Sequence, residues 1–155
     1  MMSTFTNLLF HIVYSTKYRK PVIEKSWQDD LYGYTGGIIR DHKGTLLCMG
    51  GVMDHVHLLA KLPPTIAVSD MLRLIKSNSS KMVNETIKPR IPFEWQPGYA
   101  AFSVSESQFE RVRDYILNQE EHHCKKSFQE EFIELLDKHN ITYDLRYVFE
   151  QEIIE

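Results

Sequence analysis

Apolar residues along this chain follow two repeats, the two-residue alternation of strands and the 3.6-residue spacing of helices. Residues 5–15, FTNLLFHIVYS, are rich in aromatic and β-branched side chains and predict a long first strand. Two more strands are predicted in TLLCMGGVM and DHVHLLAKL, and a fourth in YAAFSV at residues 99–104. The pair Gly50-Gly51 predicts a bulge or bend in the second strand.

Helical spacing separates and follows these strands. The predicted helices cover about residues 24–41, 68–85, 105–123 and 127–140. Ser105-x-x-Gln108 and Ser127-x-x-Glu130 match the capping box, so they predict where the last two helices begin. Residues 141–150, ITYDLRYVFE, predict a short extended tail.

The resulting order, β α β β α β α α, matches a known supersecondary plan. We predict an α+β fold: a ferredoxin-like βαββαβ antiparallel sheet with helices packed on one face, plus an extra C-terminal helix. The other face of the sheet would then stay uncovered and free for a functional role. A chain of 155 residues is expected to form one domain over residues 1–155. Because this architecture hosts nucleic-acid binders and enzymes alike, the fold alone does not name a function.

The composition is that of an ordinary globular protein, with 43% hydrophobic and 25% charged residues. No apolar run reaches about 18 residues, so no membrane-spanning segment is expected. The N-terminal residues lack the basic leader and cleavage site of a signal peptide. Cys48 and Cys124 lie far apart without CxxC spacing, so we expect no disulfide framework and a cytoplasmic location.

Charge is distributed unevenly, which changes how the net charge of −3 is interpreted. Residues 1–101 contain 12 Lys and Arg against 8 Asp and Glu, giving +4, whereas residues 102–155 contain 6 against 13, giving −7. The basic first part can bind phosphates, although a scattered solvated surface fits the charges equally well. The candidate DNA-binding residues are Lys17, Arg19, Lys20, Arg73, Lys76 and Lys81, with Tyr18 available for base stacking.

Two histidines stand one residue apart in the predicted strand DHVHLLAKL. In a strand, His55 and His57 project from one face, while Val56, Leu58 and Ala60 project from the other. Two neutral imidazoles presented in parallel can converge on one metal ion. The alternative is that both rings are half-buried residues whose polar atoms bond to the backbone.

The helix predicted over residues 105–123 carries a second group of polar side chains. Tyr115 and Gln119 are four residues apart, so they lie one above the other on the helix, and His122 extends the row. A tyrosine hydroxyl beside an amide oxygen provides a candidate nucleophile and a candidate third metal ligand. The alternative is that the tyrosine packs against the core and the glutamine is an ordinary surface residue.

Taken in order, these motifs resemble the small single-tyrosine HUH (His–hydrophobe–His) transposases of minimal bacterial insertion sequences. The blocks that carry the resemblance are HIVYSTKYRKP at 11–21, GGVMDHVHLLAKLPP at 50–64, LIKSNSSK at 74–81, EWQPGYAAFSVS at 94–105 and YILNQEEHHCKKSFQEEF at 115–132. The resemblance implies that His55, His57 and Gln119 bind a metal ion and that Tyr115 is the nucleophile. It also implies single-stranded DNA with a hairpin as the substrate, and a homodimer in which the tyrosine helix of one subunit can serve the histidine pair of the other.

The implied chemistry agrees with these residue types. A divalent cation held by two imidazoles and one amide keeps its full charge and can polarise a phosphoryl group, and Mg²⁺ or Mn²⁺ suits such a site. A tyrosine with a pKa of about 10 must be activated, and Asp54 and His122 are the candidate bases beside the site. Attack on DNA would leave a 5′-phosphotyrosine and a free 3′-OH. Rejoining the strand then needs no nucleotide cofactor, and the chain has no GxxxxGK[ST] loop.

Two other classes of function remain open on the sequence. The first is a non-catalytic binding module for single-stranded or hairpin nucleic acid, in which Tyr115 is dispensable. The second is a metallohydrolase that uses water as its nucleophile and never forms a protein–DNA adduct. A domesticated relative that cuts chromosomal hairpins would keep the same site as a mobile transposase.

Overall fold

The computed structural model describes residues 2–149. Residue 150 of the predicted tail and the ends of the predicted domain, residues 1 and 150–155, lie outside the described part. The strands are β1 (Leu9–Ser15), β2 (Thr45–Gly51), β3 (His55–Lys61) and β4 (Ala100–Val104). The helices are α1 (Lys25–Asp41), α2 (Val68–Met82), α3 (Phe109–Leu117), α4 (Gln119–His123), α5 (Phe128–Lys138) and α6 (Leu145–Val148).

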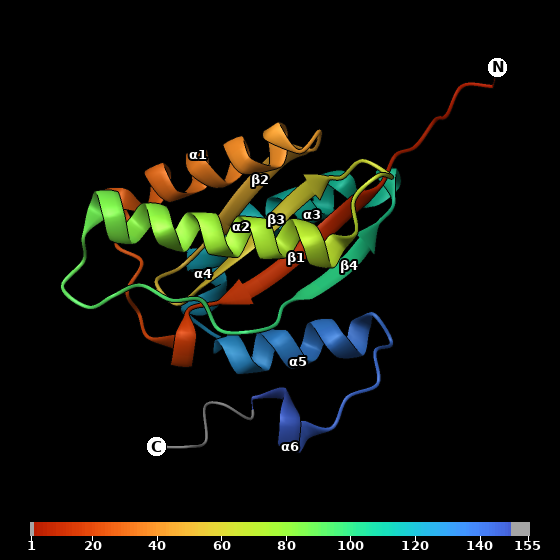
Figure 1. Cartoon of the computed structure of the whole chain (residues 1–155). Coiled ribbons are helices and arrows are strands. Elements are labelled where there is room, and N and C mark those ends of the chain that lie inside the picture. The colour runs from red at the N-terminus through yellow and green to blue at the C-terminus, as the bar shows by residue number, and fades with distance from the viewer. Residues whose placement is uncertain (1, 150–155) are drawn as a thin grey trace.

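The four strands form one antiparallel sheet in the order β2-β3-β1-β4 (Figure 1). The first strand therefore lies inside the sheet, with Val13 opposite His57 on β3 and opposite Ala100 on β4. With α1 and α2 connecting the strands, this is the ferredoxin-like βαββαβ arrangement, and the predicted fold class is confirmed.

The two faces of the sheet have different chemistry because side chains alternate along each strand. Ile12 and Tyr14 of β1, with Val56 and Leu58 of β3, point toward α1 and α2 and form the larger buried core. The residues between them, including His11 and the two predicted metal-binding histidines, point to the opposite face. The main core and the polar cluster are thus separated by the thickness of the sheet.

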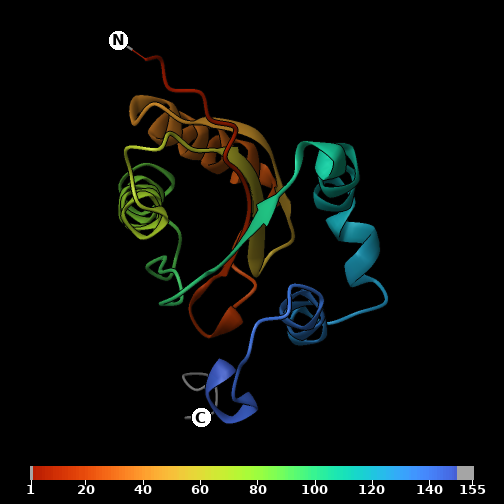
Figure 2. The same ribbon diagram turned by 90° about the vertical axis from the view of Figure 1, so that its right-hand side faces the viewer.

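The opposite face is covered, so the expectation that it stays free is wrong. Figure 2 shows α1 and α2 on one side of the sheet and α3, α4 and α5 on the other. Val13 and Phe102 of the sheet pack there with Phe128, Leu135 and Leu136 of α5. An amphipathic helix must bury its apolar stripe, and in α5 that stripe is buried against this face.

Several element boundaries differ from those predicted. The first strand begins at Leu9 because its neighbours end opposite that residue, at Lys61 and at Val104, and leave residues 5–8 without a strand to pair with. The helix predicted over residues 105–123 is a short 3-10 turn followed by α3 and α4, which are separated at Asn118.

The two predicted capping boxes and the tail also have different outcomes. The hydroxyl of Ser127 accepts the backbone N–H of Glu130 at 3.2 Å, so the cap of α5 is confirmed. Ser105 makes no such side-chain bond to the turn that follows it. The helix predicted to end near residue 85 ends at Met82 and continues as one wider turn. The predicted extended tail contains the short helix α6, whose first turn is capped by Asp144.

Within residues 2–149, no helix has both the length and the apolar character needed to cross a bilayer.

The backbones of the sheet and α3 come close together at Gly50 of β2. A Cβ atom at Gly50 would clash with the backbone carbonyl of Ile116, the residue after Tyr115. A Cβ atom added at Gly33, on α1, would have no neighbouring atom within 4 Å. Close approach of the strand to the tyrosine helix therefore requires glycine at position 50.

We expect Gly50→Ala to lower the free energy of unfolding by about 1–3 kcal/mol, because the methyl group must displace the backbone of α3. The matched change Gly33→Ala should instead raise it by about 0.5–1 kcal/mol, since it replaces glycine inside a helix without a clash. Urea unfolding of both variants measures the difference. Equal effects would contradict the proposed close packing.

Candidate active site

The side chains of His55 and His57 lie on one face of β3 and are fully buried. His55 donates from Nδ1 to the Asp54 carboxylate at 2.7 Å, because a carboxylate can only accept. This leaves His55 Nε2 facing Gln119, whose Oε1 lies 3.2 Å away. Asp54, which the sequence analysis places beside the site, thus orients the first histidine.

His57 is oriented by a histidine that the sequence analysis did not single out. His57 Nδ1 lies 2.8 Å from Nε2 of His11, which projects from the same face of β1. His57 Nε2 donates to Glu131 Oε1 at 2.9 Å. In a neutral His57 ring that donates from Nε2, Nδ1 is an acceptor, so His11 donates to it from Nε2.

Glu131 of α5 lies at the centre of the cluster. Its Oε1 is 3.3 Å from His55 Nε2 and 3.2 Å from Nε2 of His123, and only 2% of the residue is exposed. One ligand atom from each of His55, His57, His123 and Glu131 lies within 4.8 Å of all the others. This is the geometry of residues that can share one metal ion.

Gln119 joins the same cluster from the first position of α4. It is 1% exposed, and its Oε1 lies 3.1 Å from His123 Nε2 as well as close to His55. The structure therefore brings together the three predicted ligands, His55, His57 and Gln119. It adds a carboxylate and a third imidazole to what was expected to be an all-neutral donor set.

The Tyr115 hydroxyl donates a hydrogen bond to Glu131 Oε2. The Tyr115 ring centroid is 5.8 Å from that of His57, so the nucleophile candidate and the histidine pair meet within a single chain. His122, one of the two candidate bases, packs its ring against Tyr115 at 4.7 Å. Among the described residues, no hydrogen bond joins the Tyr115 hydroxyl to His122 or to Asp54.

Burial and hydrogen bonding push the ionisable groups of the cluster in different directions. Burial lowers the pKa of His57 to about 4 and that of His11 to about 3, so both rings are neutral. Burial also disfavours charge on His55, but its bonds to Asp54 and Glu131 outweigh this and raise its pKa to about 9. Burial opposes ionisation of Glu131 too, yet the surrounding imidazoles hold its pKa far below its usual range. Burial, followed by the Glu131 carboxylate, raises the pKa of Tyr115.

The residues of the cluster that were not predicted are only weakly indicated by the sequence. Glu131 lies between Phe128 and Leu135 on the apolar stripe of its helix, where a carboxylate must have a buried partner. His11 alternates with Val13 on the cluster face of β1. Neither position matches a spacing motif, because the partners are far away in the chain.

The predicted DNA-binding residues lie away from this cluster. Arg73, Lys76 and Lys81 are on α2, across the sheet from α3 and α5 (Figure 2). Lys76 donates to the backbone carbonyls of Gln96 and Gly98, both at 2.6 Å, and thereby holds the loop before β4.

The other three, Lys17, Arg19 and Lys20, lie on or next to the turn that follows β1. The ammonium groups of Lys17 and Lys20 lie 5.6 and 5.8 Å from the Tyr18 ring centroid. DNA contact by these residues and by those on α2 remains a prediction.

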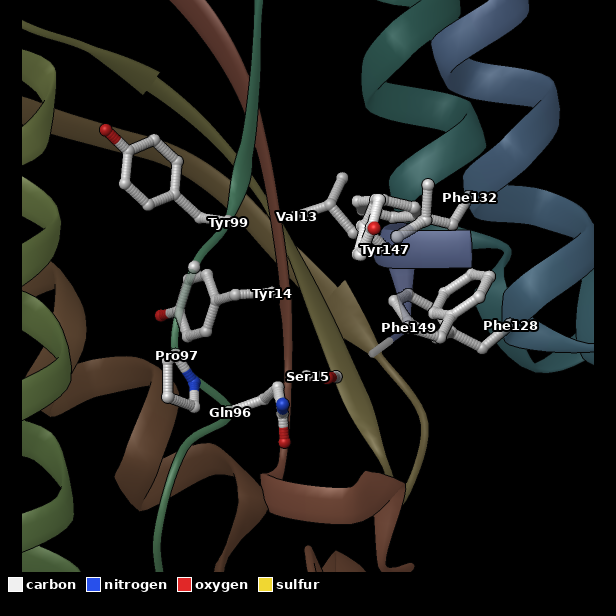
Figure 3. Close-up of a pocket in the computed structure, with 12 residues that line it drawn as sticks. Val13, Tyr14, Ser15, Gln96, Pro97, Tyr99, Phe128, Phe132, Tyr147 and Phe149 are labelled. Atoms are coloured by element: carbon white, nitrogen blue, oxygen red, sulfur yellow. The ribbon is translucent and has the colours of Figure 1, made fainter. Parts of the chain in front are cut away.

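An aromatic cavity of about 270 Å³ flanks the cluster on one side. Figure 3 shows Phe128, Phe132, Tyr147 and Phe149 gathered on one side of β1, with Tyr99 on the other. Phe128 also packs against His55, with ring centroids 4.5 Å apart. Since no charged side chain of the described residues lines this cavity, it suits an aromatic or apolar group better than a phosphate.

We expect the free energy of unfolding of the metal-free protein to be greatest near pH 6.5, the ordinary pKa of histidine. As the pH falls below this value, the unfolded chain takes up protons at His57 and His11 that the folded protein does not, so stability falls. As it rises toward about 9, folded His55 loses the proton that stabilised it, so stability falls again. Urea unfolding in EDTA across this range measures the curve.

Asp54→Asn is the control for this profile, because it removes one of the hydrogen bonds that raise the pKa of His55. The variant should flatten the alkaline side of the curve and leave the acidic side in place. A wild-type curve that rises steadily to pH 9 would show that His55 does not hold its proton as described.

Sequence comparisons place the chain among transposases. A family model described as transposase IS200 like matches residues 4–119. The ISDra2 transposase TnpA of Deinococcus radiodurans is 26% identical over 118 residues, which cover 72% of this chain and 84% of the relative. The transposase for insertion sequence element IS200 of Salmonella typhimurium is 29% identical over 122 residues, which cover 73% and 77%.

Solved structures share the fold. A crystal structure of a protein described as a transposase, from Deinococcus radiodurans R1, has a TM-score of 0.61 and 26% identity and covers 77% of this chain and 95% of its own. A REP-associated tyrosine transposase bound to a REP hairpin has a TM-score of 0.54 and 16% identity and covers 74% and 70%. Because the family model matches well over half of the 155 residues, the chain belongs to the IS200-like transposase family.

Proposed function

We propose that this chain is a metal-dependent transposase that nicks and rejoins single-stranded DNA through a covalent bond to Tyr115. One observation carries the proposal: the Tyr115 hydroxyl and the His55–His57 pair converge on one buried carboxylate, that of Glu131. A tyrosine that only packs against the core has no need of a buried cluster that can bind metal.

The donor set fits a divalent cation. His55, His57 and Gln119 would hold it, together with Glu131 and His123 from the segment beyond the family match. Imidazoles mixed with oxygen donors suit Mn²⁺ better than Mg²⁺, which prefers oxygen ligands alone, and a buried carboxylate kept ionised needs a positive partner. When bound, the ion would polarise a phosphoryl oxygen and orient the scissile phosphate.

The chain's own residues supply the nucleophile and the path for its proton. The Tyr115 oxygen attacks phosphorus, the bond from phosphorus to the 3′ oxygen breaks, and the 5′ phosphate stays on the tyrosine. The phenol proton leaves by way of Glu131 Oε2, which already accepts the hydrogen bond from Tyr115, and is delivered to the departing 3′ oxygen to give the free 3′-OH. Attack by the free 3′-OH on the phosphotyrosine reverses these steps and rejoins a strand.

Hairpin recognition and assembly belong to the same proposal. The REP-associated relative was solved with a REP hairpin, and we assign a hairpin-binding role here to the cations on α2 and on the turn after β1. We also propose a cytoplasmic protein that forms a homodimer, as the family resemblance implies. Light scattering on the purified chain gives the mass of the assembly directly.

Wild-type protein incubated with Mn²⁺ and labelled single-stranded DNA from the flanks of its own gene should give a covalent adduct on a denaturing gel. Tyr115→Phe removes the attacking oxygen and should abolish the adduct, and EDTA should do the same. Cleavage without an adduct would instead indicate a metallohydrolase, and tight binding without cleavage would indicate a binding module.

Glu131→Gln should weaken Mn²⁺ binding at least about tenfold, because an anionic ligand is replaced by a neutral one. Glu130→Gln is the matched control. The Glu130 carboxylate is exposed, so this substitution should leave the affinity for Mn²⁺ unchanged. Isothermal titration calorimetry on the folded variants measures both. Equal affinities for the two variants would remove Glu131 from the metal site.

A further inference from the structure

A second cavity, of about 400 Å³, opens beside Tyr115. It lies between the end of β4, α3 and α5, and Figure 2 shows these two helices on the same side of the sheet. His11, which bonds to His57, also lines it, so the cavity reaches from the surface to the edge of the candidate active site. Its volume falls within the range of about 300–1,000 Å³ typical of small-molecule sites.

The charge of this cavity is opposite to that of the surrounding chain. Residues 102–155 carry a net charge of −7, yet Arg111 and Lys138 both line the cavity and no acidic side chain of the described residues does. Three other cations of this segment, Arg113, Lys126 and Arg146, are in ion pairs. The side chains of Arg111 and Lys138 make no hydrogen bond or ion pair within the described part of the chain, so their positive charges are available to an anion.

Each of the two cations lies on the same helix as a residue of the candidate active site and on a similar face of that helix. Arg111 precedes Tyr115 by four residues on α3, so it lies on the same helical face about 6 Å along the axis. Lys138 follows Glu131 by seven residues on α5, which places it two turns away on a similar face. A DNA strand whose scissile phosphate reaches Tyr115 would therefore bring a neighbouring phosphate to these cations.

The rest of the lining suits a nucleobase. Val112 and Leu135 offer apolar surface, and the exposed Gln108 amide can both donate to and accept from a base edge. The His139 ring stacks on Phe102 at 4.1 Å and donates from Nδ1 to a backbone carbonyl, which fixes its orientation beside the cavity. Phosphate-binding and base-binding groups thus share one cavity.

We propose that this cavity binds the nucleotide next to the scissile phosphate, with its phosphate at Arg111 and Lys138 and its base against Val112 and Leu135. The inference rests on the proposed function, because it places the cavity relative to a bond that Tyr115 cleaves. It adds a subsite that sets which nucleotide flanks the cut.

Anisotropy titrations of labelled single-stranded DNA from the gene's flanks, in EDTA so that no cleavage occurs, test the subsite. We expect Arg111→Gln and Lys138→Gln each to weaken binding about tenfold and to lower the slope of log K against log salt by about 0.7 per lost phosphate contact. Arg113→Gln is the matched control on the same helix, since Arg113 is paired with Asp114. It should change neither quantity.

A second set of oligonucleotides carries one abasic position on either side of the cleaved bond, which is mapped from the adduct that wild type forms with Mn²⁺. One abasic position should weaken wild-type binding, and the loss should shrink in Arg111→Gln. If wild type forms the adduct but both cavity variants bind like the control, the subsite is wrong and the proposed function stands. If wild type forms no adduct, the proposed function fails, and with it the placement of this cavity beside a cleaved bond.

Discussion

The buried carboxylate of Glu131 is the group around which the polar side of this structure is arranged. It accepts hydrogen bonds from Tyr115 and from imidazoles on β3 and α4, so it ties together three elements that have no sequence motif in common. An ionised carboxylate in such a place is stable only with several donors or a cation around it. The fixed position of the tyrosine hydroxyl follows from that requirement.

The sheet makes this arrangement possible by separating two environments. One face supplies the apolar core beneath α1 and α2, while the other presents imidazoles to α3, α4 and α5. The absence of a side chain at Gly50 lets the tyrosine helix approach β2 to backbone contact. Stability is thus concentrated on the side of the sheet opposite the reactive groups, and the cluster face can be rich in polar residues.

Much of the fold could be predicted from the sequence because it depends on local periodicity. The succession of strands and helices along the chain, the positions of α1 and α2 and the Ser127 cap follow from spacings within a few residues. The His55 and His57 pair and the Tyr115–Gln119 row were visible for the same reason. Their meeting, and the addition of Glu131, depends on contacts between residues 74 and 76 positions apart in the chain, which no local pattern records. The packing of helices on the histidine face of the sheet was not predicted, because the apolar stripe of an amphipathic helix does not identify the surface that it packs against.

The donor set spans the boundary of the family match, which ends at residue 119, while Glu131 and His123 lie beyond it. The candidate metal site of this chain therefore extends beyond the segment that the family model matches. Because α5 lies outside the matched segment, a chain with the same His-x-His strand and tyrosine helix but another closing helix would have a donor set of different charge. Ion preference would then evolve by exchange of a terminal segment, without any change to the shared core.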